Sequence, residues 1–212
     1  MDTRRLARTV SASAVAIGAY AALLAVSRPL HRRWGATDEE IERPMPGDEL
    51  SERATANHAI TIEAPIEEVW SWLVQIGQDR AGFYSYSWLE NLVGADIHNS
   101  DRIVPEWQSL KNGDRIRLAS EKRFGDGPLL RVSHVQPGRS FVLEGWGAFV
   151  LEPIDEETTR MIIRTHRVKR APWLRVLDFF LIEPAHFIME RGMLLGIKKR
   201  AERTAGQRKA AA

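Results

Sequence analysis

The sequence predicts an α+β fold in which a curved antiparallel sheet wraps round a long C-terminal helix. Three features predict it: an isolated strand followed by two short helices, a run of short strands from Gly113 to Val168, and a long apolar helical segment from Pro172 to about Arg203. Elements in this order suit one domain with extensions, as do 212 residues of which 44% are hydrophobic and 27% are charged. We expect the sheet and the last helix to enclose a cavity for a small apolar molecule.

Composition excludes several classes of function. The formal net charge is only +2, and the basic residues cluster mainly at the two ends of the chain. A nucleic-acid-binding protein concentrates Lys and Arg on one element with aromatic residues between them, so we expect no nucleic-acid partner. The chain has no cysteine, which excludes disulfides, thiolate nucleophiles and cysteine metal sites.

The first 33 residues predict a single-pass membrane anchor. The run from Val10 to Val26 carries no charge, and arginines stand on both sides of it: Arg4, Arg5, Arg8, Arg28, Arg32 and Arg33. A secretory signal peptide with a cleavage site at Ala25-Val26-Ser27 is one alternative, which Arg28 disfavours, and a helix belonging to the soluble domain is another. Because both flanks are basic, the side of the membrane is left open.

Residues 34–56 predict a polar linker. Seven acidic residues accompany Pro44, Pro46 and Gly47 there, namely Asp38, Glu39, Glu40, Glu42, Asp48, Glu49 and Glu52. Little of such a segment could be buried, so it would hold the domain away from a membrane surface.

The domain begins with a predicted strand and two helices. His58–Ala64 places Ile60 and Ile62 on one side, which is typical of a half-buried strand. Pro65 then starts a helix that ends at Gly77 and has one apolar face, formed by Ile66, Val69, Trp70 and Leu73. A second short helix is predicted from Ser85 to Leu92.

Five strands and a long helix complete the predicted domain. The strands form an antiparallel meander over Asp114–Ala119, Leu129–Val135, Ser140–Glu144, Ala148–Glu152 and Thr159–Val168. In the last of them Arg160, Arg164 and His166 share a face that we expect to be solvated, and Met161, Ile163 and Thr165 share the other. Pro184 must kink or divide the helix, which we place in the trough of the sheet because its charges interrupt any membrane-length run. Residues 204–212 predict a disordered basic tail.

The head of the domain resembles a known family. The pattern strand-Ala-Pro-x-Glu-x-Val-Trp is matched by Ile62, Ala64, Pro65, Glu67, Val69 and Trp70. On it, residues 57–203 resemble the SRPBCC superfamily, the START-like helix-grip group that includes polyketide cyclase/dehydrase-like proteins, and residues 75–107 look like a bacterial subgroup of it. The resemblance implies a helix-grip fold and a cavity, but no particular activity. The sequence after Gly77 departs from the cyclases, so their catalytic residues cannot be carried over.

Two groups of residues are candidates for the site. In a helix-grip fold residues 75–107 would cross the cavity mouth, and we expect five of their polar and aromatic side chains to line or gate it: Arg80, Tyr84, Tyr86, Trp88 and His98. The alternative is that the aromatic residues plug the open end of the sheet while Arg80 pairs with Glu90 on the surface. On the last helix, Glu183, His186 and Glu190 share one face. His186 and Glu190 face the cavity in one interpretation, and a buried Glu–His or Glu190–Arg191 pair fixes the helix in the other.

The sequence indicates neither a metal nor a cofactor. The Glu183-x-x-His186 spacing occurs in di-iron bundles, but those need two copies, and the other histidines follow no zinc pattern. No glycine-rich phosphate loop or Gly-x-Ser-x-Gly motif is present.

Three functions remain as hypotheses. The leading one is a membrane-tethered binding or carrier domain for a small hydrophobic, lipid- or polyketide-like ligand. The second is a cyclase, dehydratase or lyase acting on an aromatic polyketide-like substrate, with acid/base catalysis by His98, His186, Glu90 or Tyr84. The third is a non-catalytic interaction module, in which the aromatic segment is an exposed patch for a protein partner.

Overall fold

The computed structural model describes residues 3–51, 54–126, 128–166, 171 and 173–211, and side chains from residue 13 to residue 210. The helices are α1 (Thr3–Arg32), α2 (Asp38–Glu42), α3 (Ile66–Leu73), α4 (Ser87–Leu92), α5 (Glu121–Phe124), α6 (Leu174–Leu177) and α7 (Glu183–Ala211), with short turns η1 (Asp48–Leu50), η2 (Pro105–Trp107) and η3 (Asp178–Ile182). The strands are β1 (Ala54–Ile62), β2 (Arg115–Arg117), β3 (Leu129–Gln136), β4 (Ser140–Leu143), β5 (Gly147–Pro153) and β6 (Thr159–His166). Glu52, Val168 and Pro172, which belong to the predicted linker, last strand and helix, lie outside the described residues.

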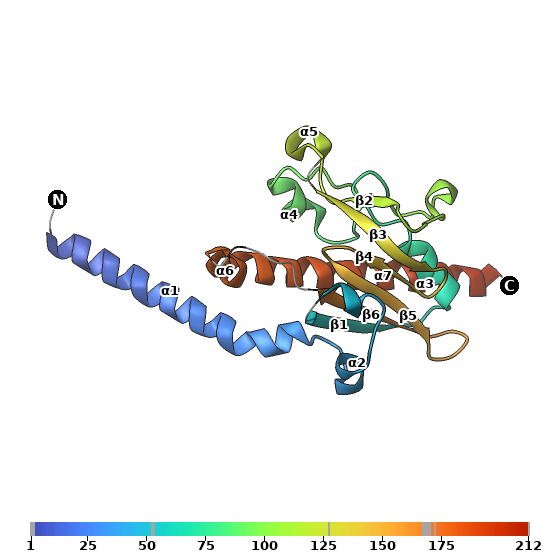
Figure 1. Cartoon of the computed structure of the whole chain (residues 1–212), viewed down its shortest axis with the longest axis horizontal. Coiled ribbons are helices and arrows are strands. Elements are labelled where there is room, and N and C mark those ends of the chain that lie inside the picture. The colour runs from blue at the N-terminus through green and yellow to red at the C-terminus, as the bar shows by residue number, and fades with distance from the viewer. Residues whose placement is uncertain (1–2, 52–53, 127, 167–170, 172, 212) are drawn as a thin grey trace.

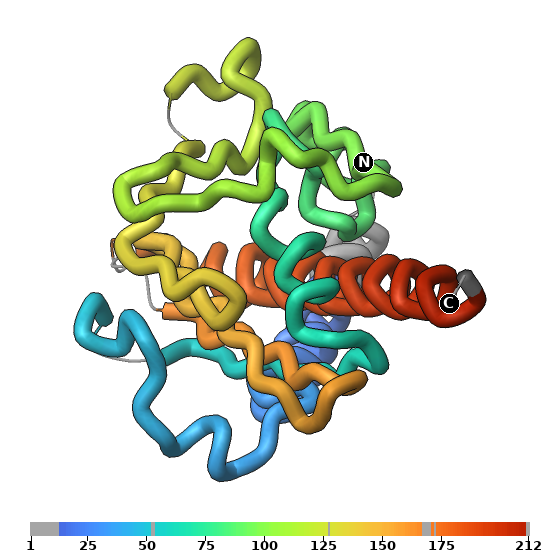
Figure 2. Tube along the Cα trace, turned by 90° about the vertical axis from the view of Figure 1, so that its right-hand side faces the viewer, coloured from blue at the N-terminus to red at the C-terminus, as the bar shows by residue number. Residues whose placement is uncertain are grey.

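The predicted fold is confirmed. The six strands form one antiparallel sheet in the order β1-β6-β5-β4-β3-β2, so the first strand closes against the last (Figure 1). Figure 2 shows α7 running across the middle of the domain, with the strands passing round it from β2 to β1. The largest fully buried side chains lie between sheet, α3 and α7, among them Trp72, Phe141, Phe149 and Met161. The predicted break near Pro184 is also present, since α6 and the π-helical turn η3 precede α7.

The predicted polar linker is wrong for residues 34–51, which we call the strap. The strap begins beside β1, where Ala59 N donates to Trp34 O at 3.0 Å, and then crosses the outer face of the sheet. Glu40 is buried and accepts from Arg160 Nε at 2.7 Å. Met45 packs in a second, smaller core with Ile162 of β6. Two of the acidic residues, Glu40 and Asp48, therefore neutralise arginines of the sheet, whereas Asp38, Glu39, Glu42 and Glu49 remain exposed.

The same contacts overturn the predicted solvated face of β6. Arg164 is only 3% exposed, and its guanidinium donates to Asp48 Oδ2 at 2.6 Å, to Asn57 Oδ1 at 2.8 Å and to three strap carbonyls. A buried charge persists only when it is paired and hydrogen-bonded in this way. The sequence indicates that the strap and this face of β6 are both polar, but it does not show that they pack against each other.

The predicted disordered tail is also wrong, because α7 continues to Ala211. Ala201 and Ala205 are buried on the core side of the helix. Farther along, Arg208 pairs with Glu68 at 3.0 Å and Lys209 with Glu157 at 2.7 Å. These two basic residues therefore pair with carboxylates of the domain, and the helix continues about two turns beyond its predicted end.

Helix α1 extends away from the domain (Figure 1). Its segment Ser13–Arg32 is long and apolar enough to cross a membrane, and only 6% of the apolar window is buried against the rest of the described chain. The contacts with the domain lie in its C-terminal half: Leu24 is buried, and Arg28 and Arg32 both bind Glu183 of α7.

Candidate functional site

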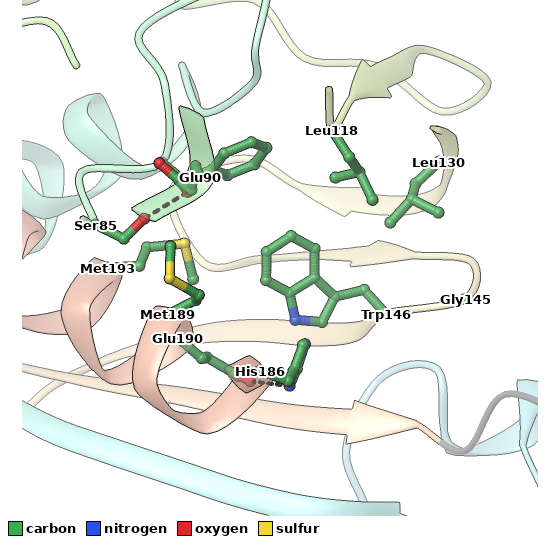
Figure 3. A pocket seen from close by; sticks show the side chains of 11 residues that line it. Ser85, Glu90, Leu118, Leu130, Gly145, Trp146, His186, Met189, Glu190 and Met193 are labelled. Carbon is green, nitrogen blue, oxygen red and sulfur yellow. Dashed lines mark hydrogen bonds and ion pairs between the residues drawn. The ribbon is translucent and has the colours of Figure 1, made fainter. Parts of the chain in front are cut away.

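A cavity of about 300 Å³ lies beside α7, and we call it the inner cavity. This volume is at the lower end of the range that small-molecule sites occupy. Figure 3 shows side chains from α7, the loop before α4, α4 itself and the strand region converging on it. Its lining is mainly apolar and consists of Phe83, Ser85, Glu90, Leu118, Leu130, Gly145, Trp146, His186, Met189, Glu190 and Met193.

Glu90 of α4 supplies a carboxyl group to one wall. Ser85 Oγ donates to Glu90 Oε1 at 2.7 Å, whereas Glu90 Oε2 is buried and has no hydrogen-bond partner among the described residues. Burial raises the pKa of Glu90, and the bond from Ser85 offsets this only in part. Glu90 therefore holds its proton to a higher pH than an ordinary glutamate.

His186 and Glu190 of α7 form the opposite wall. They are four residues apart on the helix, and His186 Nδ1 lies 3.2 Å from Glu190 Oε2. Glu190 is only 1% exposed, and Thr165 Oγ1 of β6 donates to it at 3.2 Å while His58 Nδ1 of β1 lies 3.5 Å away. The carboxylate thus occupies Nδ1 of His186, and Nε2 is the nitrogen left for a ligand.

The pKa of Glu190 shows the effect of these partners. Burial alone raises it, but the charges of His186 and His58 and the bonds from His58 and Thr165 together bring it below its ordinary value. Glu190 is therefore an anion inside the domain. It fixes the ring orientation of His186 through the 3.2 Å contact with Nδ1.

Trp146 adds a third polar group. It follows Gly145 in the β4–β5 turn, where the φ of Gly145 is +87°, and its ring stands edge-on to His186 with centroids 5.7 Å apart. Its Nε1 is buried and, within the described part of the chain, has no hydrogen-bond partner. A buried donor left unpaired costs about 1–3 kcal/mol, so a ligand oxygen that accepts from it would be stabilised.

An outer cavity of about 510 Å³ lies between the end of α1, β1 and the start of α7. His186 and Gly145 line both cavities, so the two cavities are adjacent there. The outer cavity is more polar: Arg28, Arg32 and Arg175 line it with Asp178 and Glu183. Burial raises the pKa of Glu183, but bonds from Arg28 and Arg32 at 2.7–3.1 Å outweigh it and lower the pKa to about 2.

Three of the predicted site residues reach the inner cavity: Glu90, His186 and Glu190. The Glu–His pair predicted as a helix-fixing alternative also exists, because the buried Glu190 holds His186 while both line the cavity. Arg191 is not part of it, since its guanidinium lies over the Trp34 ring at 5.1 Å. Glu183, on the same predicted face, turns to α1 and does not line the inner cavity.

None of the five predicted residues Arg80, Tyr84, Tyr86, Trp88 and His98 lines either of these two cavities. Tyr84 is a core residue: it is 3% exposed, its hydroxyl accepts from Gln75 Nε2 at 2.7 Å, and Arg200 lies over its ring at 4.7 Å. Burial raises the pKa of Tyr84, which makes it a poor acid or base at neutral pH. The alternative of core aromatic residues therefore holds for Tyr84.

The other four lie at the surface or outside both cavities. The His98 side chain is 82% exposed and faces Asp96 at 3.0 Å, and Trp88 is 65% exposed. Tyr86 is 38% exposed and borders α7 near Gly192. Arg80 is half-buried, and the predicted Arg80–Glu90 pair does not form because Ser85 takes Glu90. The segment folds back on itself where Gly77 and Gly82 pair, and its residues that line the inner cavity are Phe83, Ser85 and Glu90.

The sequence prediction missed Trp146, Met189, Met193, Leu118, Leu130 and Ser85 as lining residues. Helical spacing carried a signal for two of them, because Met189 and Met193 are three and seven residues after His186. Thr165 was placed on the inner face of its strand, and this placement is confirmed by its bond to Glu190. Trp146 follows a turn glycine, and nothing in the sequence indicated its neighbours.

The described residues contain no group of three or more metal-ligating side chains that could hold a metal ion. Glu183, the first residue of the Glu-x-x-His spacing, is bound by two arginines.

Comparison with known proteins adds similarities of arrangement. No family model matches the chain, and no curated protein matches it in sequence. Among solved structures it is similar to the self-sacrificing resistance protein CalC from Micromonospora echinospora, with 10% identity over 69% of this chain and 95% of that one and a TM-score of 0.42. The Polyketide_cyc-like protein Cgl2372 from Corynebacterium glutamicum gives 16% identity over 69% and 91%, with a TM-score of 0.33. DynU16, a putative protein in the dynemicin biosynthetic locus, gives 15% identity over 65% and 45%, with a TM-score of 0.35.

These scores are low, so the fold is established by the chain's own topology. A single antiparallel sheet closes its first strand on its last and surrounds one long C-terminal helix. This is a helix-grip fold, as the order of elements in the sequence predicted.

Proposed function

We propose that the chain is a binding or carrier domain for a small, mainly apolar molecule, held in the inner cavity and anchored to a membrane by α1. One observation carries the proposal: an apolar cavity with buried polar groups that lack partners among the described residues, Glu90 Oε2 and Trp146 Nε1. Apolar walls with a few placed polar groups are typical of ligand sites.

The polar groups define the class of ligand. The indole N–H of Trp146 donates, and the raised pKa of Glu90 favours the neutral carboxyl, which also donates, so both groups favour a ligand oxygen such as a hydroxyl or carbonyl. Met189 and Met193 between them are flexible and polarisable, which suits a flat or irregular apolar body. We therefore propose a neutral, mainly apolar molecule with one or two oxygen atoms.

The membrane part of the proposal is supported by α1. Its uncharged run leaves large side chains exposed on the described structure, including Val15 at 72%, Leu23 at 64% and Val26 at 77%. Apolar side chains in such numbers on one isolated helix need a partner surface, and the length fits a bilayer.

Acid/base catalysis is a second candidate function. It is favoured by two carboxyl groups with opposite pKa shifts, Glu90 and Glu190, at one cavity. His186, oriented by Glu190, would accept a proton from the substrate, and Glu90 would donate one to a leaving hydroxyl on the other side. In this dehydration the C–H and C–O bonds of the substrate break and a C=C bond forms. The proton passes to His186, and the hydroxyl leaves as water with the proton from Glu90.

The experiment uses the full chain purified in detergent micelles. Solvent extraction and mass spectrometry would identify any molecule carried through purification, and 2-naphthol would serve as a probe in calorimetric titrations. Replacing Met189→Trp should fill the cavity and reduce 2-naphthol affinity at least about tenfold, which is about 1.4 kcal/mol. The matched control is Ile154→Trp at the exposed β5–β6 turn. Equal binding by both variants, with no apolar molecule extracted, would refute the proposal. Conversion of an extracted molecule that ceases in His186→Gln would favour the enzyme.

A further inference from the structure

The segment from Trp173 through α6 and η3, which we call α6–η3, carries an exposed apolar surface. Trp173 is 75% exposed, Val176 65%, Leu177 43% and Leu181 62%. The first three are spaced three and four residues apart, so they share one side of the helical segment. Soluble surfaces rarely gather four large apolar side chains within nine residues, and such a patch marks a contact surface.

This segment lies alongside the apolar part of α1. The rings of Tyr20 and Phe180 are 6.0 Å apart, and Tyr20 Oη donates to the carbonyl oxygen of Phe180 at 3.0 Å. Closer to the domain, the Arg28 guanidinium lies over the Phe179 ring at 5.4 Å. In Figure 1, α6 lies at the end of the C-terminal helices that faces α1.

The position of Tyr20 sets a depth. Tyr20 lies inside the uncharged run Val10–Val26, six residues before its last member. At 1.5 Å per residue it is about 9 Å from that end of the run. If α1 spans a bilayer, a segment that contacts Tyr20 lies at about the same depth as Tyr20.

We propose that α6–η3 is a second membrane element, which inserts its Trp173–Leu181 side into the interfacial layer of the bilayer that α1 spans. The depth of about 9 Å agrees with the roughly 5–10 Å at which interfacial helices lie. Trp173 and Tyr20 have the amphipathic rings that are enriched at this level. Arg175, exposed on the same short helix, can reach the lipid phosphates. The inference rests on the membrane part of the proposed function.

The test exploits the absence of cysteine in the chain. Single cysteines would be introduced as Val176→Cys and Leu181→Cys in the full protein, spin-labelled and reconstituted in vesicles of phosphatidylcholine with a minority of phosphatidylglycerol. Two reference variants accompany them: Leu23→Cys on α1 and Ile154→Cys on the β5–β6 turn, which are 64% and 58% exposed. Power saturation with oxygen and with a water-soluble nickel chelate measures whether each label faces lipid or water.

The proposal predicts that the labels at positions 176 and 181 resemble the label at position 23, with oxygen more effective than nickel, and that the label at 154 shows the reverse. Nickel accessibility at 176 and 181 together with a lipid-facing label at 23 would overturn this inference and leave the α1 anchor standing. A water-facing label at 23 would overturn both. Spin–spin broadening at 176 that disappears on dilution with unlabelled protein would show that a second copy covers the surface, which also overturns the inference.

Discussion

Glu90 and Glu190 line the same cavity, yet their pKa values shift in opposite directions. Both carboxyl groups lose solvation, which raises a pKa. Glu90 has only the Ser85 hydroxyl as compensation, whereas Glu190 has two imidazoles and a threonine. Burial alone therefore does not decide the charge of a carboxyl group, because the charges and hydrogen bonds around it can outweigh the loss of solvation. One wall of the cavity thus favours the neutral form of its carboxyl group, and the other favours the anion, which contacts His186.

The largest expected effect tests the Glu190 wall. Glu190→Ala leaves His58, Thr165 and His186 without their shared carboxylate, and breaking such a buried charged network costs about 3 kcal/mol. Thermal unfolding in micelles would measure the loss, with the exposed Glu156→Ala as the control. An unfolding temperature equal to that of the control would mean that the network does not stabilise the fold.

The pH dependence of stability should separate the two walls. The folded-state pKa of Glu190 is lowered, so its contribution is present above the ordinary glutamate pKa and is lost as the pH falls through the folded value. The folded-state pKa of Glu90 is raised, so its contribution is present at low pH and is lost as the pH rises through the folded value. Thermal unfolding of Glu90→Gln, Glu190→Gln and wild type over roughly pH 3 to 8 would measure both slopes. If both substitutions changed the slope of stability against pH in the same direction relative to wild type, the opposite pKa shifts of Glu90 and Glu190 would be contradicted.

A smaller effect is expected at the third polar group. Trp146→Phe keeps an aromatic ring beside His186 but removes the indole N–H. The affinity for 2-naphthol should fall by about three- to tenfold, since a neutral hydrogen bond contributes about 1 kcal/mol. Calorimetry with 2-methylnaphthalene, which lacks the hydroxyl, provides the control and should show no difference. A loss that is equal for both probes would indicate a packing effect only.

The smallest effect is expected at His98. Its side chain is 82% exposed and lies outside both cavities, so His98→Ala should change the free energy of unfolding by less than about 0.5 kcal/mol and leave 2-naphthol affinity unchanged. Loss of binding in this variant would restore the cavity-mouth interpretation of the segment.

The fold was predictable from local patterns, because each element carries its own signal. The alternation in β1, the apolar face of α3 after Pro65 and the turn glycines between strands are all short-range features. The strap and the end of α7 were mispredicted, because their polar residues are stabilised by partners distant in sequence, such as Glu40 with Arg160 and Lys209 with Glu157.

The candidate site was predictable only where one helix carries it. His186 and Glu190 share a helical face, so their neighbourhood could be inferred from spacing. Glu90 meets them only through the folding of residues 77–90, where Tyr84 adopts a positive φ of 58° and turns into the core. A non-glycine residue in that conformation is uncommon, and the pattern of side chains gives no sign of it.

The strap also has a mechanical consequence. A free linker would let the domain move independently of helix α1, but Glu40, Met45 and Asp48 hold this stretch against the outer face of the sheet. The strap contacts therefore restrict how helix α1 can move relative to β6. Proteolytic cleavage that released the strap would remove this restriction and expose the buried Arg164 at the same time.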